Sequence, residues 1–262
     1  MIEHVYATRY VTPLREGGSL PGVVEANDFG TYVMKFRGAG QGLKALVAEV
    51  VVGELGRRLG LRVPELTAIT LDSAIGKYEA DQEVQDLLTA SVGLNLGVDF
   101  LPGSFGWDSS YAVDEEEGAR ILWLDAFTAN IDRSWRNPNV LIWHKQLWLI
   151  DHGAALYFHH GWSRGLSSPQ RFAEQPYDAT DHIMIGHASH LAAADDHCSK
   201  TISRELLADV LAQVPDEWLE PVPAGGVEVG LSGPAEVRLA YVEHLIARLE
   251  NRGRWLPKGQ AA

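Results

Sequence analysis

Three polar side chains in the middle of the chain have the types and the order that phosphoryl transfer requires. Asp132 lies in a loop, Asn139 begins a β-rich run over 140–143, and Asp151 ends a second β-rich run over 147–150. A hairpin of these two runs brings its ends together, so we expect Asn139 and Asp151 to be neighbours with Asp132 beside them. Their oxygens suit Mg²⁺, and an Asp that is not a metal ligand can accept a proton from an attacking hydroxyl. The pattern therefore predicts a phosphoryl-transfer site with a base and a metal.

The loop that carries Asp132 follows a predicted helix. Apolar residues between 121 and 127 have helical spacing, and this spacing stops near Asn130, where Asn, Asp and Pro favour turns. A plainer interpretation of the same stretch is an Asn-rich turn before a structural hairpin, in which each Asp only shapes the backbone. The order of these residues, together with their partners upstream, favours the chemical interpretation.

Lys35 and Glu49 are those partners upstream. A hairpin is predicted whose second strand, 32–36, carries Lys35, and apolar spacing over 43–59 predicts a helix with Glu49 near its middle. Glu54 lies on the same helix and is a rival to Glu49. Taken alone, Lys35 is a solvent-facing lysine and Glu49 a solvated helix charge. The succession of strand, glycine linker and acidic helix favours a functional interpretation.

This order of residues resembles that of the HipA-like kinases, a branch of the protein-kinase-like fold related to the type II phosphatidylinositol 4-kinases. The resemblance rests on the run Asn130-x-Asp132-Arg133, on an Asn before the hairpin, and on the run Asp151-x-Gly153. The lysine strand and the glutamate helix upstream extend it to about two thirds of the chain.

The resemblance implies an α+β, bilobal protein-kinase-like fold. Residues 1–96 would form a β-rich N-lobe with the glycine loop, lysine strand and glutamate helix, and residues 97–262 a mainly helical C-lobe. Amphipathic spacing over 202–214 and 234–256 predicts two helices of that C-lobe. The implied activity is ATP- and Mg²⁺-dependent transfer of the γ-phosphoryl group to a protein serine or threonine. HipA-type toxins also imply an antitoxin-like partner.

The resemblance also assigns a role to each candidate side chain. Lys35 would lie against the α and β phosphates of ATP, paired with Glu49. Asp132 would be the catalytic base and Asp151 a ligand of Mg²⁺. Arg133, which follows the base, would either offset the transferred charge or anchor the loop.

The second metal ligand has two candidates. Kinases usually place this Asn five residues after the catalytic Asp, which is Asn137 here, whereas the Asn that leads directly into the strand is Asn139. We favour Asn139, with an insertion of two residues, and retain Asn137 as the rival.

The nucleotide contacts are predicted from two further segments. Gly17, Gly18 and Ser19 form a turn that would cover the phosphates, since glycine permits close backbone approach. Ser19 at its tip is a candidate for self-phosphorylation. Phe100, within the segment 99–101, would lie near the adenine edge, in a hinge strand and crossing between the lobes.

Composition and charge narrow the function classes. The 262 residues are 46% hydrophobic and 22% charged, as in ordinary globular proteins. A net charge of −13 argues against nucleic acid or an anionic membrane as a partner. No apolar run is long enough to span a membrane, and the first residues lack a secretory signal. With Cys198 as the single cysteine, a cytoplasmic protein without an internal disulfide is expected.

Other functions remain as alternatives. One is a catalytically silent module of kinase-like fold that binds a nucleotide or a partner protein, and another is a lipid or small-molecule kinase. A transition-metal site in the histidine-rich segment 152–197 is not expected, because a pair such as His187-x-x-His190 lacks the spacing of known metal motifs.

Overall fold

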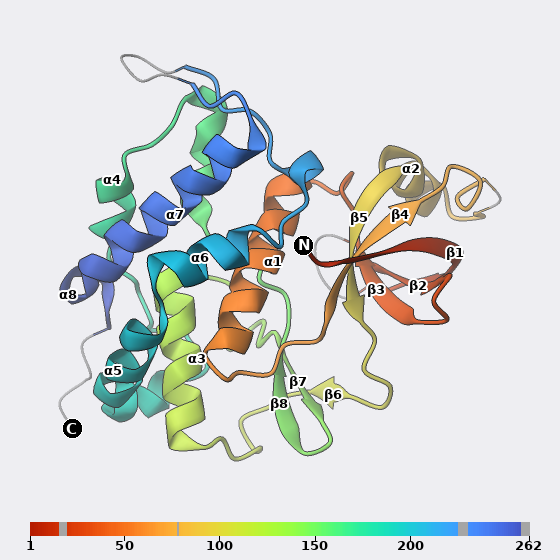
Figure 1. The fold of residues 1–262 in the computed structure, drawn as a ribbon. Helices are drawn as coiled ribbons and strands as arrows, with labels where there is room; N and C mark the ends of the chain where they lie inside the picture. Colours follow the sequence, from red (N-terminus) through yellow and green to blue (C-terminus); the bar gives the residue numbers. More distant parts are fainter. Residues whose placement is uncertain (16–19, 78, 225–229, 258–262) are drawn as a thin grey trace.

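The computed structural model of the protein describes residues 1–15, 20–77, 79–224 and 230–257. The expected glycine loop, Gly17, Gly18 and Ser19, lies outside these residues. Figure 1 shows a β-barrel at one side and a group of helices at the other, with the helix α1 (Gly42–Arg58) between them. The predicted mixture of strands and helices is therefore confirmed.

The barrel has five strands in the order β1-β2-β3-β5-β4 and is closed by parallel pairing of β1 with β4. The strands are β1 (Glu3–Pro13), β2 (Gly22–Ala26), β3 (Thr31–Lys35), β4 (Leu66–Leu71) and β5 (Gly93–Asp99). β5 lies between β3 and β4 although its sequence is rich in glycine. Gly97 is required there, because a Cβ atom at this position would collide with the Ile69 side chain of β4.

The helix α1 is buried around most of its circumference. The sequence predicted a helix packed on one side, but buried residues occur in every turn from Leu46 to Gly56. The reason is its position, since α1 also contacts α3 (Glu115–Thr128) and α6 (Arg204–Leu211). Its buried surface includes one carboxylate, that of Glu49.

The predicted hairpin is present directly after α3. It consists of β7 (Val140–Trp143) and β8 (Gln146–Leu149), and the short strand β6 (Phe105–Gly106) pairs with β7. Asn139 and Asp151 flank the hairpin with φ angles of 51° and 57°. This left-handed backbone costs Asn and Asp less than most residues, so the two candidate metal ligands also shape the ends of the hairpin.

The remaining elements are helical, and most of them are short. They are α2 (Gln82–Ala90), η1 (Tyr157–Arg164), α4 (Pro169–Ala173), η2 (Ile185–His190), α5 (Leu191–Thr201), η3 (Asp216–Trp218), α7 (Pro234–Glu250) and α8 (Arg252–Trp255). The helix expected over 234–256 is divided at Asn251, whose side chain donates to the Ala247 carbonyl at 2.8 Å.

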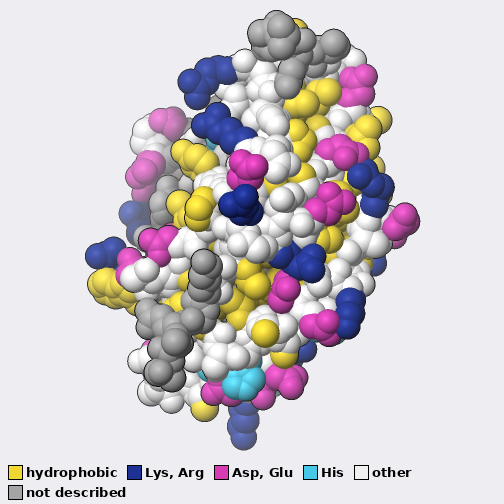
Figure 2. Space-filling view, turned by 90° about the vertical axis from the view of Figure 1, so that its left-hand side faces the viewer, with side chains coloured by type: hydrophobic (Ala, Val, Ile, Leu, Met, Phe, Trp, Pro, Cys, Tyr) yellow, Lys and Arg dark blue, Asp and Glu magenta, His cyan; other side chains and the backbone are white. Residues whose placement is uncertain are grey.

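On the helical face in Figure 2, acidic and basic side chains are interspersed. Among the described residues, no helix is both long and apolar enough to cross a membrane.

Arg248 of α7 joins the helices behind the predicted catalytic loop. Its guanidinium is fully buried and donates to the carbonyls of Ala126 and Phe127, in the last turn of α3, and to those of Phe172 and Gln175. Burial lowers the pKa of Arg248 to about 9, so the side chain stays charged at neutral pH. A cation at the carboxyl end of a helix is favourable, and this one holds the end of α3 in place.

We expect Arg248→Met to lower the free energy of unfolding by about 2–4 kcal/mol, because buried carbonyls lose their donor. Urea denaturation monitored by tryptophan fluorescence measures the change. Arg254→Met is the matched control, since Arg254 is exposed on α8, and its effect should stay within about 0.5 kcal/mol. Equal stability of the two variants would contradict the anchoring role of Arg248.

Candidate active site

Lys35, Glu49 and Asp151 meet where the barrel faces the helices. Lys35 is the last residue of β3, Glu49 lies in the middle of α1, and Asp151 follows β8. The Lys35 ammonium donates to Glu49 Oε1 and to Asp151 Oδ1, the latter at 2.7 Å. The other oxygen of Glu49 accepts the backbone N–H of His152 at 2.9 Å. One lysine thus joins two consecutive elements, β3 and α1, to the turn after β8, which lies 116 residues further along the chain.

The charges in this cluster stabilise one another. Burial alone would lower the pKa of Lys35, but the charges of Glu49 and Asp151 outweigh it and the pKa is raised. Burial tends to raise the pKa of Asp151, whereas the charge of Lys35 and its hydrogen bond tend to lower it. The net result is a lowered pKa. The Glu49 side chain is 3% exposed and that of Asp151 is 42% exposed. Asp151 is therefore the carboxylate that a ligand from solvent can reach.

The choice between the two glutamates of α1 is decided by their partners. Glu49 contacts Lys35, whereas Glu54 pairs with Arg57 at 2.5 Å on the same helix. Of the two glutamates, Glu49 is therefore the one placed to act as the predicted partner of the strand lysine.

The Asp132 carboxylate is oriented by both candidate asparagines. Its Oδ2 accepts from the side-chain amide of Asn137 at 2.8 Å and from that of Asn139 at 3.1 Å. The backbone N–H of Asp132 donates to Asn130 Oδ1 at 3.2 Å. Asp132 is half-buried, and no cation among the described residues pairs with it. A carboxylate held in this way can accept a proton.

Asn139 and Asp151 lie on adjacent ends of the hairpin. The Ile150 N–H donates to the Asn139 carbonyl at 3.1 Å, which continues the β7–β8 ladder to the residue before Asp151. Because the amide nitrogen of Asn139 is used on Asp132, its side-chain oxygen remains available. That oxygen and the exposed carboxylate of Asp151 are hard donors that fit Mg²⁺, which takes few protein ligands beside substrate phosphates. Asn137 is exposed and also bonds within its own turn.

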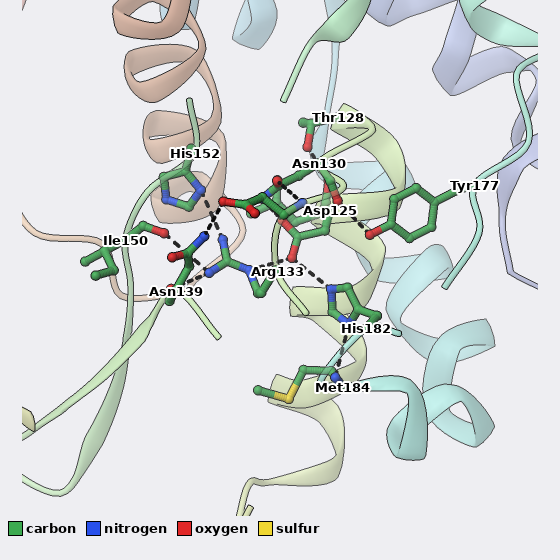
Figure 3. A network of polar contacts seen from close by, with 12 residues as sticks. Asp125, Thr128, Asn130, Arg133, Asn139, Ile150, His152, Tyr177, His182 and Met184 are labelled. Atoms are coloured by element: carbon green, nitrogen blue, oxygen red, sulfur yellow. Dashed lines mark hydrogen bonds and ion pairs between the residues drawn. The ribbon is translucent and has the colours of Figure 1, made fainter. Parts of the chain in front are cut away.

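Arg133 is buried and connects the loop to the hairpin, as Figure 3 shows. Its Nε donates to Asp125 Oδ2 at 2.6 Å, and its Nη1 donates to the Asn139 carbonyl. Its Nη2 lies 3.2 Å from His152 Nδ1. Arg133 is only 1% exposed, so its guanidinium contacts protein groups and not solvent. Of the two expected roles, these contacts favour anchoring of the loop.

Asp125 is the counter-ion of Arg133 and lies fully buried on α3. Its carboxylate also accepts from the Asn130 amide at 2.8 Å and contacts His182 Nε2 at 3.0 Å. His182 Nδ1 accepts the Met184 N–H, so Nε2 is the ring donor. Burial alone would raise the pKa of Asp125, but the charge of Arg133 and the bond from His182 lower it strongly. Asp125 is ionised at neutral pH.

His152 stands between the two ionic clusters. Its backbone is bonded to Glu49 and its ring contacts Arg133. Burial, with a further contribution from the charge of Arg133, lowers the pKa of His152 to about 3. The ring is therefore neutral at physiological pH and contributes shape and a hydrogen-bond acceptor, not charge.

The structure brings most of the predicted residues together and leaves others apart. Lys35, Glu49 and Asp151 form one cluster, and Asp132 forms another with its two asparagines. Phe100 follows β5, where its N–H donates to the Thr31 carbonyl at 3.0 Å and its side chain is 39% exposed. It contacts neither cluster.

Sequence reasoning missed Asp125 and His182. The available signal for Asp125 was an acidic residue within an otherwise apolar stretch of α3. His182 belongs to the histidine-rich segment, in which His187 also contacts a protein group, the Glu115 carboxylate, at 2.8 Å. No group of three or more His, Cys, Asp or Glu side chains in the described part of the chain is arranged to bind a metal ion.

Comparison with known proteins gives information on the family and on the fold. A family model described as HipA-like kinase matches residues 8–256. The fold is similar to that of the Helicobacter pylori proinflammatory kinase CtkA, with a TM-score of 0.52, 11% identity, and coverage of 97% of this chain and 95% of that one. A Golgi casein kinase structure matches with a TM-score of 0.41 and 13% identity over 96% of this chain and 72% of its own. No curated protein sequence matches significantly. At this identity, the likeness to CtkA shows a kinase-like fold.

We expect Asp125→Asn to lower the free energy of unfolding by about 3–5 kcal/mol, because it leaves the buried guanidinium of Arg133 without a counter-ion. Urea denaturation measures the change. Asp178→Asn serves as the control, since Asp178 is exposed and bonds only within its own turn. An Asp125→Asn variant as stable as the control would show that the ion pair does not hold the loop.

Proposed function

The chain belongs to the HipA-like kinase family, as its sequence motifs predicted, and from this premise we propose that it is an ATP- and Mg²⁺-dependent kinase that phosphorylates serine or threonine hydroxyls of a protein. The observation that carries the proposal is the contact of Lys35 with both Glu49 and Asp151. Phosphoryl transfer needs a positioned cation beside a metal-binding carboxylate, and this contact supports these roles for Lys35 and Asp151.

The nucleotide would bind between two lobes. A β-rich N-lobe and a mainly helical C-lobe would divide near residue 96, within β5, and Phe100 would lie near the adenine edge. Gly17, Gly18 and Ser19 would cover the phosphates. The barrel lies on one side of α1 and most of the helices lie on the other, which supports this division.

Lys35 would hold the phosphates. Glu49 keeps its ammonium in place from the buried side, while Asp151 contacts it from the exposed side. When phosphate oxygens enter, Lys35 can exchange its bond to Asp151 for bonds to the α and β phosphates, since both partners are anionic oxygens. Asp151 is then released for a cation.

Asn139 and Asp151 would hold Mg²⁺, which would supply positive charge to offset the negative charge of the phosphates. The free side-chain oxygen of Asn139 and the exposed carboxylate of Asp151 support this pair. Asn137 would only orient Asp132.

Asp132 would accept the proton of the acceptor hydroxyl. The acceptor oxygen forms a bond to the γ-phosphorus, the bond from that phosphorus to the β–γ bridging oxygen breaks, and ADP leaves with the electron pair. The two amide donors hold the carboxylate in place. Arg133 acts as a positioning residue through the Asn139 carbonyl, because its guanidinium is buried.

Incubation with labelled ATP and Mg²⁺ in a cell lysate tests the proposal. Labelled protein bands that depend on the enzyme support it, and phosphoamino-acid analysis identifies the acceptor as serine or threonine. Family membership also supports an antitoxin-like partner protein, which co-purification would detect. Binding of ATP without any transfer would instead favour the silent nucleotide-binding module. Mass spectrometry after the incubation tests whether Ser19 is modified.

We expect Asp132→Ala to reduce phosphoryl transfer by about 10²–10⁴-fold, because the general base is lost, while the Kd for ATP changes little. Transfer of label and isothermal titration measure the two quantities. Asp181→Ala is the control, since only the backbone carbonyl of Asp181 contacts the catalytic loop, at Trp135. Undiminished transfer by Asp132→Ala would remove Asp132 from the mechanism.

We expect Asp151→Ala to abolish the effect of Mg²⁺ on ATP binding, because the exposed metal ligand is gone. The test compares the Kd for ATP in Mg²⁺ with that in EDTA. Wild-type protein should bind more tightly with Mg²⁺, and the variant equally in both buffers. If Mg²⁺ strengthens ATP binding by the same factor in the variant, then Asp151 is not its ligand.

A further inference from the structure

A cavity of about 310 Å³ lies beside the start of α1. None of the residues of the candidate active site lines it. Its walls come from α1, η1, η3 and α7, and η3 contacts α1 there. In Figure 1 the segment with η3 lies next to the N-terminal end of α1. This volume is at the lower end of the range for small-molecule sites.

Lys44 supplies the cavity with an unpaired positive charge. Its side chain is half-buried, and among the described residues it has neither an ion pair nor a hydrogen bond. Lys35 and Lys200, by contrast, each contact a carboxylate. A lysine at the cavity wall whose ammonium contacts no carboxylate in the described part of the chain can pair with a bound anion.

The field of Lys44 reaches the neighbouring histidines. Burial lowers the pKa of His160, and the charge of Lys44 lowers it further. His159 is buried and its pKa is lowered as well, by burial first and then by the charges of His160 and Lys44. The charge of Lys44 therefore acts on both histidines.

Three aromatic side chains, Trp162, Trp218 and Tyr241, give the cavity an apolar wall. Each is at most 2% exposed, and each has its polar atom engaged elsewhere. Those contacts are from Trp162 to Ser167, from Trp218 to the Leu94 carbonyl, and from Tyr241 to His159. The aromatic groups can thus offer mainly carbon surface to a ligand.

We propose that this cavity binds a small organic anion with a flat apolar body, whose single carboxylate or sulfonate pairs with Lys44. The aromatic wall would contact the apolar body. Glu220 also lines the cavity and is exposed, and its charge disfavours a ligand with a second negative group. Lys44 and Glu49 are on the same helix, so the ligand would contact the element that holds Lys35.

The test uses the probe 8-anilinonaphthalene-1-sulfonate, whose fluorescence rises when it binds to an apolar site. The probe is titrated into the folded protein. Lys44→Gln should raise its Kd about tenfold, since a charge-assisted contact is lost. Lys44→Arg, which keeps the charge, should stay within about twofold of wild type. Lys200→Gln, on the surface, should have no effect. Circular dichroism verifies that each variant is folded.

Two further arms test the apolar part of the site. Ser163→Phe, at an exposed lining position, should block the cavity and weaken probe binding at least tenfold. The uncharged analogue N-phenyl-1-naphthylamine should bind wild-type protein at least tenfold more weakly than the sulfonate. An equal Kd for wild type and Lys44→Gln, unchanged binding by Ser163→Phe, or equal affinity for the uncharged analogue would each overturn the proposal. None of these readouts depends on kinase activity.

Discussion

The position of the barrel relative to the helices depends on the two ion pairs that Lys35 forms with Glu49 and Asp151. They join the last residue of β3, the middle of α1 and the turn after β8. Because Glu49 is buried, removing the lysine would leave an uncompensated charge inside the protein, which costs several kcal/mol. The barrel and the helices are therefore held in register at the point where the chemistry is proposed.

A second buried ion pair, Arg133 with Asp125, fixes the loop that carries Asp132 to α3 and to the hairpin. The two ionic clusters meet at His152, whose N–H is bonded to Glu49 and whose ring contacts Arg133. His152 thus links α1 to the loop that carries Asp132. The neutral state of that ring keeps a third charge out of the junction.

Local sequence determined most of the elements. Alternating and helical spacings indicated β3, α1 and the hairpin at nearly their observed bounds, because these patterns depend on neighbours a few residues apart. The proximity of Asn139 and Asp151 followed from the hairpin alone, since its two strands fix the distance between their ends. The choice of HipA-like kinases as the family rested on the same short motifs and is confirmed.

Tertiary structure decided which side chains meet across the sequence. Lys35 contacts Glu49 and not Glu54 because of the rotation of α1 against β3. Asp125 and His182 are 57 residues apart in the sequence and meet only in the folded chain. The burial of Arg133 is likewise invisible locally, because an arginine in a polar loop has the pattern of a solvated one. Spacing along the chain determines elements and the partners within them, whereas desolvation and charge pairing between elements exist only once the chain has packed.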